Sequence, residues 1–256
     1  PGTRETVLRG LSELHLRTTL DQLQARYRIE LDTDRPSVAY RETITAGALG
    51  QHRHKKQTGG AGQFGEVMLR VEPLPRGSGF EFVSAVVGGA IPGSLIPAVE
   101  KGVREGLAAG AIAGYPLVDL KVVVTDGKHH PVDSKEVAFV AAGRKALLAA
   151  VREAHPVVME PIVDLEVQVP QDSIGNITGD LAGRRGRVLG TRALPHGRMM
   201  VVAQAPLSEL DEYPERLKAM TSGSASYTLE LAEYEPVPES LQRTLCAAFK
   251  HGGEAD

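Results

Sequence analysis

The residues of this chain best suited to acid–base chemistry or metal binding are two adjacent histidines, His129 and His130. They follow an apolar, β-branched segment at 118–125, and the polar loop that carries them ends where a helix is predicted. Asp133 is the expected N-cap of that helix, with Glu136 as its capping-box partner, which explains the two carboxylates more simply than a catalytic pair. Adjacent histidines lack the ligand spacing of a metal site, and no nucleophile is identifiably paired with them. A solvated loop, a nucleic-acid contact, and catalysis or metal binding therefore stay open.

A glycine-rich stretch at 60–65 matches G-x-G-x-x-G, and Val67 extends it to the form found in protein kinases. A dinucleotide site needs a strand before this motif and a helix after it, whereas here a polar basic segment precedes it and a strand follows. The other kinase motifs and the G-x-x-x-x-G-K-[ST] motif are absent. A flexible turn and an RNA contact remain. We favour RNA, because glycines let the backbone approach closely beside Arg53, Lys55 and Lys56.

A second basic cluster, Arg184, Arg185 and Arg187, places three cations within four residues at the end of a predicted helix. Favourable charge at a helix C-terminus explains one arginine better than three, and contact with phosphate accounts for the rest. The glycines of that helix recur every four residues and give it one flat face, suited to close packing on a sheet or on RNA: Gly175, Gly179 and Gly183.

The composition sets limits on the class of protein. The 256 residues are 42% hydrophobic but only 4% aromatic, so aliphatic packing must dominate, and the net charge of −3 means that any RNA contact depends on local basic clusters. The single cysteine excludes an internal disulfide framework and suits a reducing cytosol. No apolar run approaches the ~18 residues of a membrane span, and no signal peptide opens the chain. Because the first residue is Pro1, we expect a fragment or a processed product.

The elements that must position these residues fall into three groups. The first is a helix beginning near Ser12 between short strands at 7–9 and 27–31, which resembles half of a domain and ends at a boundary near 34–36. The second begins at 38–44. It has strands at 67–71, 80–87 and 118–125, a helix from Ser94 to Gly110, and a helix that follows the histidine loop and stops at Pro156.

The third group has the order βαββαβ, the split βαβ or ferredoxin-like arrangement. Its first strand alternates, with Val163, Leu165, Val167 and Val169 on one face. The remaining elements are a helix capped by Asp172, strands at 187–193 and 199–205, a helix at 210–220 and a strand at 227–231. A short helix at 241–249 ends the chain.

Ordered motifs spread over nearly the whole chain resemble the C-terminal half of bacterial elongation factor G, the translocase GTPase, or a close paralogue. They are Glu13–Leu16, Val38–Glu42, Gln57–Gly60, Gly62–Gly65, Ile96–Gly102, Ala113–Pro116, His130 with Val132–Ser134, Glu160–Pro161, and Gly179–Leu181 with Arg184–Gly186. The resemblance implies a multidomain α+β fold. Residues 1–35 would be a partial ferredoxin-like third domain, 36–156 with 235–256 an elongated fourth domain with a left-handed βαβ crossover, and 157–234 a ferredoxin-like fifth domain.

The resemblance also implies a function in GTP-dependent translocation. The tip of the fourth domain would enter the A site and hold the peptidyl-tRNA and the codon–anticodon helix in register, with His130 as the tip histidine and His129 as a bystander. The implied RNA-binding tip residues are Gln57, Thr58, Gly59, Gly60, Gly62, Gln63, Lys128, His129 and His130. The implied ribosome-binding basic residues are Arg53, Lys55, Lys56, Arg184, Arg185 and Arg187.

The expected partners are both ribosomal subunits and the tRNA and mRNA of the A site. We expect a cytoplasmic monomer without membrane contact, catalytic residues or a metal site. GTP and Mg²⁺ belong to the family's N-terminal domain, which this chain lacks, so the chain is not expected to hydrolyse GTP itself.

Some positions depart from the family pattern: Ala61 in the glycine loop, Pro131 and Lys135 in the histidine loop, and the segment Thr221–Ala225. These changes suggest a divergent paralogue, and ribosome recycling or protection against an antibiotic are alternative tasks. Both tip loops resemble the elongation type rather than the protection type. Outside the family, an independent histidine-based enzyme and a two-domain module without an RNA role are the remaining alternatives.

Overall fold

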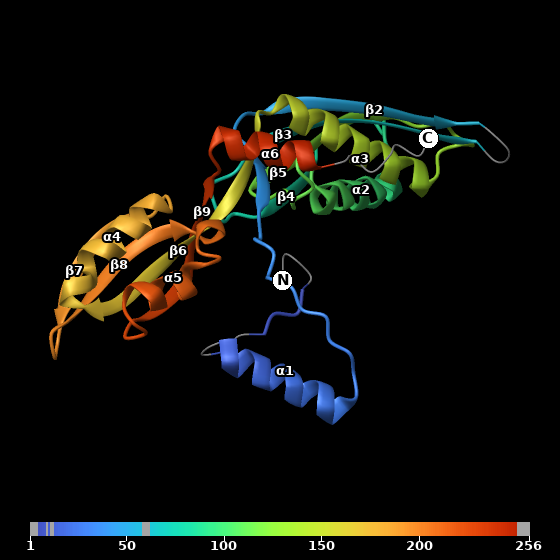
Figure 1. Ribbon diagram of the computed structural model, residues 1–256. Helices are drawn as coiled ribbons and strands as arrows, with labels where there is room; N and C mark the ends of the chain where they lie inside the picture. Colours follow the sequence, from blue (N-terminus) through green and yellow to red (C-terminus); the bar gives the residue numbers. More distant parts are fainter. Residues whose placement is uncertain (1–4, 9, 11–12, 58–61, 250–256) are drawn as a thin grey trace. The chain divides into compact units, whose positions relative to one another are not determined.

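The structure is a computed structural model that describes residues 5–8, 10, 13–57 and 62–249 (Figure 1). The chain divides into two compact units, Pro1–Ala39 and Tyr40–Asp256, and the second contains both β-sheets. No helix in the described part of the chain is long and apolar enough to cross a membrane.

The described part of the first unit contains one helix, α1 (Glu13–Tyr27), as the leucine spacing predicts. The predicted flanking strands are wrong wherever they are described, because residues 7, 8 and 28–31 have no strand structure; Arg9 lies outside the described residues. An extended segment needs a neighbouring strand for its backbone hydrogen bonds, and no described strand pairs with either segment.

The first sheet of the second unit has the strand order β2-β3-β5-β4. The strands are β2 (Ala48–Lys56), β3 (Gln63–Pro73), β4 (Phe80–Ser84) and β5 (Leu120–Lys128). β4 and β5 run parallel and are joined through helix α2 (Ile96–Ala109), whereas the other neighbours are antiparallel. This connection is a βαβ unit; the left hand expected for it stays a prediction.

Helices α2 and α3 (Glu136–Glu153) cover one face of this sheet (Figure 1). Alternate residues of the strands and one stripe of each helix share a single core: Val67, Leu69, Val71, Leu120, Val122, Val124, Val99, Val103, Leu107, Leu147 and Val151. The two helices lie so close that a Cβ added to Gly102 would be 2.0 Å from the carbonyl oxygen of Val140. Only glycine fits there, so the contact fixes how the helices pack.

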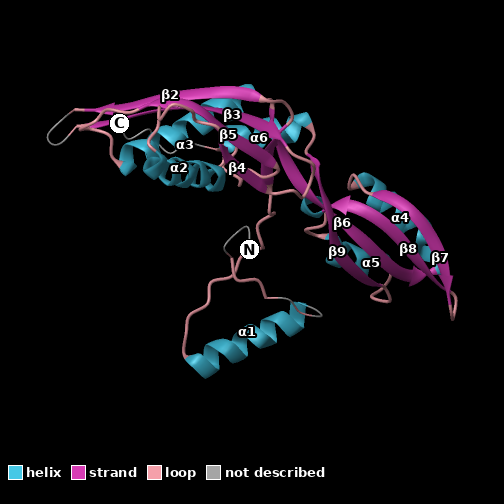
Figure 2. Ribbon diagram, turned by 180° about the vertical axis from the view of Figure 1, so that it is seen from behind, coloured by secondary structure: helices cyan, strands magenta, loops and turns pink. Residues whose placement is uncertain are grey.

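The second sheet has the order β1-β6-β8-β7, and β9 also pairs with β6. The strands are β1 (Arg41–Ile44), β6 (Pro156–Pro170), β7 (Arg187–Leu194), β8 (Arg198–Pro206) and β9 (Ser226–Pro236). Helices α4 (Ile174–Gly183) and α5 (Tyr213–Met220) lie on one face of the sheet, behind the strands in Figure 2. The order β6-α4-β7-β8-α5-β9 is the predicted βαββαβ arrangement, and the inward residues predicted for β6 are buried. The predicted α+β fold class is confirmed.

The predicted helix caps are wrong. α3 begins at Glu136 with Lys135 as N-cap, and no side chain caps it. The backbone of Asp133 is instead tied to the start of β3, because its carbonyl accepts the N–H of Phe64 at 2.9 Å. α4 has Ser173 as N-cap, again without a side-chain hydrogen bond, so Asp172 does not cap it. Short 3-10 helices precede α2, α4 and α5, at Gly93–Leu95, Gln171–Ser173 and Leu207–Glu209.

A buried carboxylate anchors the loop that follows α2. The side chain of Glu42 on β1 is 0% exposed and accepts four backbone N–H groups, at 2.7–3.0 Å, from Ala111, Ile112, Ala113 and Tyr115. Helix α6 (Glu239–Ala248) packs its Leu241 and Leu245 in the same apolar cluster as this loop.

Candidate nucleic-acid interface

The strand register brings three chain segments to one end of the four-stranded sheet. Lys56 of β2 pairs with Gln63 of β3, and Glu66 of β3 pairs with Lys128 at the end of β5. β4 runs parallel to β5, so the segment after Ser84 leaves at the same end. We call this end the sheet tip and define it by its described residues, Lys55–Gln57, Gly62–Gln63, Ala85–Pro92 and Lys128–Ser134.

The glycine-rich hairpin and the histidine loop are joined at the sheet tip. The backbone oxygen of Phe64 accepts a hydrogen bond from the hydroxyl of Ser134 at 2.9 Å, in addition to the bond from its N–H to Asp133. A Cβ added to Gly62 would lie 2.8 Å from the carboxylate of Asp133. The structure therefore places Gly62 and the loop of His130 side by side.

His130 is held by backbone groups of its own loop. Its Nδ1 accepts the N–H of Val132 at 3.3 Å and the N–H of Asp133 at 3.2 Å, and its own N–H donates to Ser134 Oγ at 2.8 Å. The ring also meets Phe64 edge-on, with 6.4 Å between centroids. Because Nδ1 acts as an acceptor, the neutral ring carries its proton on Nε2. The side chain is 52% exposed, so this Nε2–H is available to a ligand.

The basic residues at and beside the sheet tip differ in whether they form ion pairs within the protein. The guanidinium of Arg53 pairs at 2.7 Å with Glu66, whose side chain is 1% exposed. Burial alone would raise the pKa of Glu66, but hydrogen bonds from Arg53 and Gln51 and the charges of Arg53 and Lys128 outweigh it, so the pKa is lowered. Lys55 and Lys56 are exposed and form no ion pair with any described residue. Lys128, at the end of β5, is exposed as well and has no ion pair among the described residues, so all three lysines are available to phosphate.

Of the RNA-binding residues predicted in the glycine-rich hairpin, three lie outside the described residues: Thr58, Gly59 and Gly60. Gln57 is exposed, and the side-chain oxygen of Gln63 lies 3.0 Å from His54 Nε2. The polar basic segment before the glycines, which the sequence did not assign to a strand, belongs to β2. The G-x-G-x-x-G motif therefore lies in a hairpin, and the absence of a following helix still argues against a dinucleotide site.

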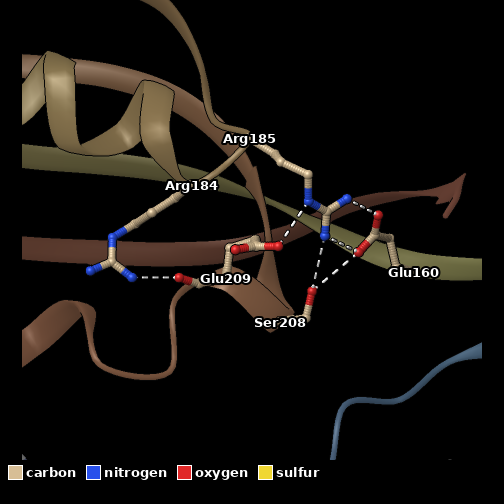
Figure 3. Close-up of polar contacts among 5 residues, drawn as sticks. All are labelled: Glu160, Arg184, Arg185, Ser208 and Glu209. Atoms are coloured by element: carbon tan, nitrogen blue, oxygen red, sulfur yellow. Dashed lines mark hydrogen bonds and ion pairs between the residues drawn. The ribbon is translucent and has the colours of Figure 1, made fainter. Parts of the chain in front are cut away.

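Arg184 and Arg185, which follow α4, form hydrogen bonds with other residues of the chain (Figure 3). Arg185 binds Glu160 through both terminal nitrogens, at 2.6 and 2.9 Å, and Glu209 through Nε at 2.8 Å. The hydrogen bonds to Glu160 raise the pKa of the Arg185 guanidinium above its ordinary value. Arg184 pairs with Asp180 at 2.8 Å and donates to the backbone oxygen of Glu209 at 2.7 Å.

Arg184 and Arg185 thus already form hydrogen bonds with carboxylates and a carbonyl of the protein, and their contact with phosphate stays a prediction. Arg187 is exposed on β7, where it donates to Gln204 at 2.5 Å, and its phosphate contact stays a prediction. The flat glycine face of α4 does not pack on the sheet. A Cβ added to any of its three glycines would meet no atom within 4 Å.

Sequence reasoning missed the segment Ala85–Pro92, which it assigned in part to a strand; β4 ends at Ser84. The signal that could have found it is the glycine pair Gly88-Gly89 directly after an apolar strand. The described residues contain no group of three or more His, Cys, Asp or Glu side chains that could hold a metal ion.

Comparison with known proteins gives consistent matches. A family model described as "Elongation factor G, domain IV" matches residues 36–155, and one described as "Elongation factor G C-terminus" matches residues 157–245. An "Elongation factor G-like protein" of Thermotoga maritima is 42% identical over 245 residues, which cover 96% of this chain and 36% of that protein. "Elongation factor G" of Aquifex pyrophilus is 42% identical over 242 residues, covering 94% of this chain and 34% of that protein.

A crystal structure of a Thermus thermophilus protein superimposes with a TM-score of 0.79 at 41% identity, over 93% of this chain and 35% of that one. The chain thus spans about a third of the length of the relatives it matches.

Proposed function

The chain belongs to the elongation factor G family, and on that premise we propose that it is the part of a translation factor that promotes translocation of tRNA and mRNA. The sheet tip enters the A site on the decoding side and holds the codon–anticodon helix while it moves. The GTP and Mg²⁺ that drive the cycle bind outside this chain. The partners are both ribosomal subunits, with the A-site tRNA and mRNA, and the factor acts as a cytoplasmic monomer.

The observation that carries this proposal is the joined pair of loops at the sheet tip. Hydrogen bonds between Phe64 and the loop residues Asp133 and Ser134 hold the glycine hairpin against the histidine loop. Rigid strands and a helix support both, so the ring of His130 is presented without the entropic cost of ordering a free loop. An A-form helix offers a wide, shallow minor groove lined with 2′-hydroxyls. A fixed Nε2–H donor next to exposed lysines suits such a surface and does not depend on base sequence.

The contribution of the chain is steric and electrostatic, and it makes or breaks no covalent bond. Nε2–H of His130 donates to a ribose or phosphate oxygen, Lys55 and Lys56 screen nearby phosphates, and the bulk of the domain prevents the duplex from slipping back. A neutral hydrogen bond is worth about 1 kcal/mol, so removing the donor is expected to slow a step that depends on it about five-fold.

We also propose the domain boundaries 1–35, 36–156 with 235–256, and 157–234. What supports the return of the C-terminal segment to the fourth domain is the packing of α6 with the loop 111–115 in one apolar cluster.

The test is a His130→Asn variant in the full-length factor. The Asn side-chain oxygen can replace Nδ1 as acceptor of the loop N–H groups, while the Nε2–H donor is lost. We expect single-round translocation to slow about five-fold, with ribosome-dependent GTP hydrolysis unchanged. His196→Asn, at an exposed turn between β7 and β8, is the matched control and should have no effect. Translocation by His130→Asn at the wild-type rate would remove the role assigned to this histidine.

A further inference from the structure

The third segment of the sheet tip, Ala85–Pro92, is anchored at both ends and projects in the middle. At its start the N–H of Ala85 donates to the backbone oxygen of Val124 at 2.8 Å. At its end Ile91 is 2% exposed and packs over β5, where a Cβ added to Gly127 would lie 2.6 Å from its side chain. Between these anchors the side chain of Val87 is 81% exposed.

The two residues after Val87 form a turn. Gly88 has φ 67° and Gly89 has φ 71°, a region that favours glycine, and a Cβ added to either would meet no atom within 4 Å. Both glycines therefore leave open space over their backbone. A ligand can therefore approach these amide groups closely.

His129 holds this segment to the end of β5. Its Nδ1 lies 3.1 Å from the backbone oxygen of Ala90. A carbonyl oxygen can only accept a hydrogen bond, so Nδ1 of His129 must carry a proton. The neighbouring His130 uses the opposite arrangement, since its Nδ1 accepts from the backbone. His129 thus has a structural contact that the sequence did not predict.

We propose that Ala85–Pro92 is a third contact element of the sheet tip, positioned by His129, and that its partner is the sugar–phosphate backbone of an A-form RNA duplex. This inference rests on the proposed function, because it assigns a further part of the same interface. Val87 lies against ribose carbons, and the amides of Gly88 and Gly89 approach 2′-hydroxyl or phosphate oxygens.

RNA fits this segment better than a protein partner does. The segment carries no charged side chain of its own. Lys128 ends the neighbouring strand β5, and Lys55 and Lys56 end β2, at the same end of the sheet but at its other edge. Backbone donors at the same end of the sheet as these lysines suit a polyanion, and such contacts carry no dependence on base sequence.

The first experiment measures single-round translocation by the full-length factor. His129→Ala removes the donor to Ala90 and is expected to slow translocation at least three-fold. His129→Asn, whose side-chain N–H can take the place of Nδ1–H, should restore most of the rate. Val87→Glu places a negative charge against RNA and is expected to slow translocation at least five-fold. Leu49→Glu is the matched control, because Leu49 is also highly exposed but lies at the opposite end of β2, and it should have no effect.

The second experiment identifies the partner. A photoreactive group is attached to Val87→Cys in a Cys246→Ala background, and the factor is trapped on ribosomes before translocation. Crosslinks to tRNA, mRNA or ribosomal RNA support the proposal, and crosslinks to ribosomal protein alone overturn it. If His129→Ala and Val87→Glu translocate at the wild-type rate while His130→Asn is slow, the third contact is refuted and the proposed function stands. If all three variants are unchanged, the proposed function fails as well.

Discussion

Glu42→Gln is expected to destabilise the second unit, although it only replaces one carboxylate oxygen with an amide NH₂ group. The carboxylate of Glu42 is fully buried and accepts four backbone N–H groups from the loop 111–115. The amide nitrogen of glutamine has no lone pair to offer and is itself a donor. Whichever way the amide is oriented, it faces two of those N–H groups with a donor in place of an acceptor.

The size of the effect follows from the cost of unsatisfied donors. Each buried N–H without a partner costs about 1–3 kcal/mol, so the loss of two acceptors amounts to roughly 2–6 kcal/mol. A neutral amide is easier to bury than a carboxylate, which offsets part of that loss. We therefore expect the free energy of unfolding to fall by about 3 kcal/mol. With a urea m-value of about 2 kcal/mol/M, the unfolding midpoint falls by about 1.5 M.

Urea denaturation followed by circular dichroism measures this shift. Because the unit contains two sheets with separate cores, hydrogen exchange at the amides of Ala111 and Ala113 gives the local readout and should be faster in the variant. Glu81→Gln, at an exposed residue of β4 that pairs only loosely with Lys121 (3.5 Å), should stay within about 0.5 kcal/mol of wild type. A Glu42→Gln protein with unchanged midpoint and exchange rates would refute the account of the carboxylate.

Other substitutions test separate parts of the structure. Gly102→Ala forces a methyl group into the backbone of α3 and should lower the free energy of unfolding by about 2–3 kcal/mol. Urea denaturation measures this loss, and an unchanged stability would show that α2 and α3 can move apart at no cost. Arg185→Ala leaves the buried Glu160 without its counter-charge and should cost about 3–5 kcal/mol by the same assay, whereas a variant as stable as wild type would show that the pair is dispensable. The lowered pKa of Glu66 means that its contribution is present above the unfolded pKa and is lost as pH falls through the lower folded pKa. Glu66→Gln should therefore flatten the acid side of the stability–pH curve, and an unaltered curve would contradict this.

The sequence predicted those parts of the fold in which apolar side chains show a clear period. The alternation of β6 and the stripe of α2 that includes Val99 and Val103 correspond to buried faces. Strand β2 was missed because its residues 52–56 are polar, and it packs on α3 through Gly50, whose added Cβ would lie 2.2 Å from the backbone oxygen of Ala146. A backbone contact of this kind leaves no hydrophobic pattern.

The candidate site was predictable to the extent that it depends on local motifs. The sequence located the histidine and glycine loops, but it could not show that Asp133 joins them instead of capping α3. The ion pairs of Arg185 could not be predicted, because its acidic partners lie far away in sequence: Glu160 is 25 residues before Arg185, and Glu209 is 24 residues after it. The contact between His129 and Ala90 joins residues 39 positions apart, so no local sequence motif could predict it.

The central claim, that the sheet tip contacts the moving RNA, is tested most directly by an electron cryomicroscopy structure of the full-length factor trapped on a ribosome with tRNA and mRNA in the A site. The account predicts Nε2 of His130 within hydrogen-bonding distance of a ribose or phosphate oxygen of the codon–anticodon duplex, with the Val87 segment against the same RNA. A structure in which the sheet tip lies in solvent, or rests only on ribosomal protein, would contradict it.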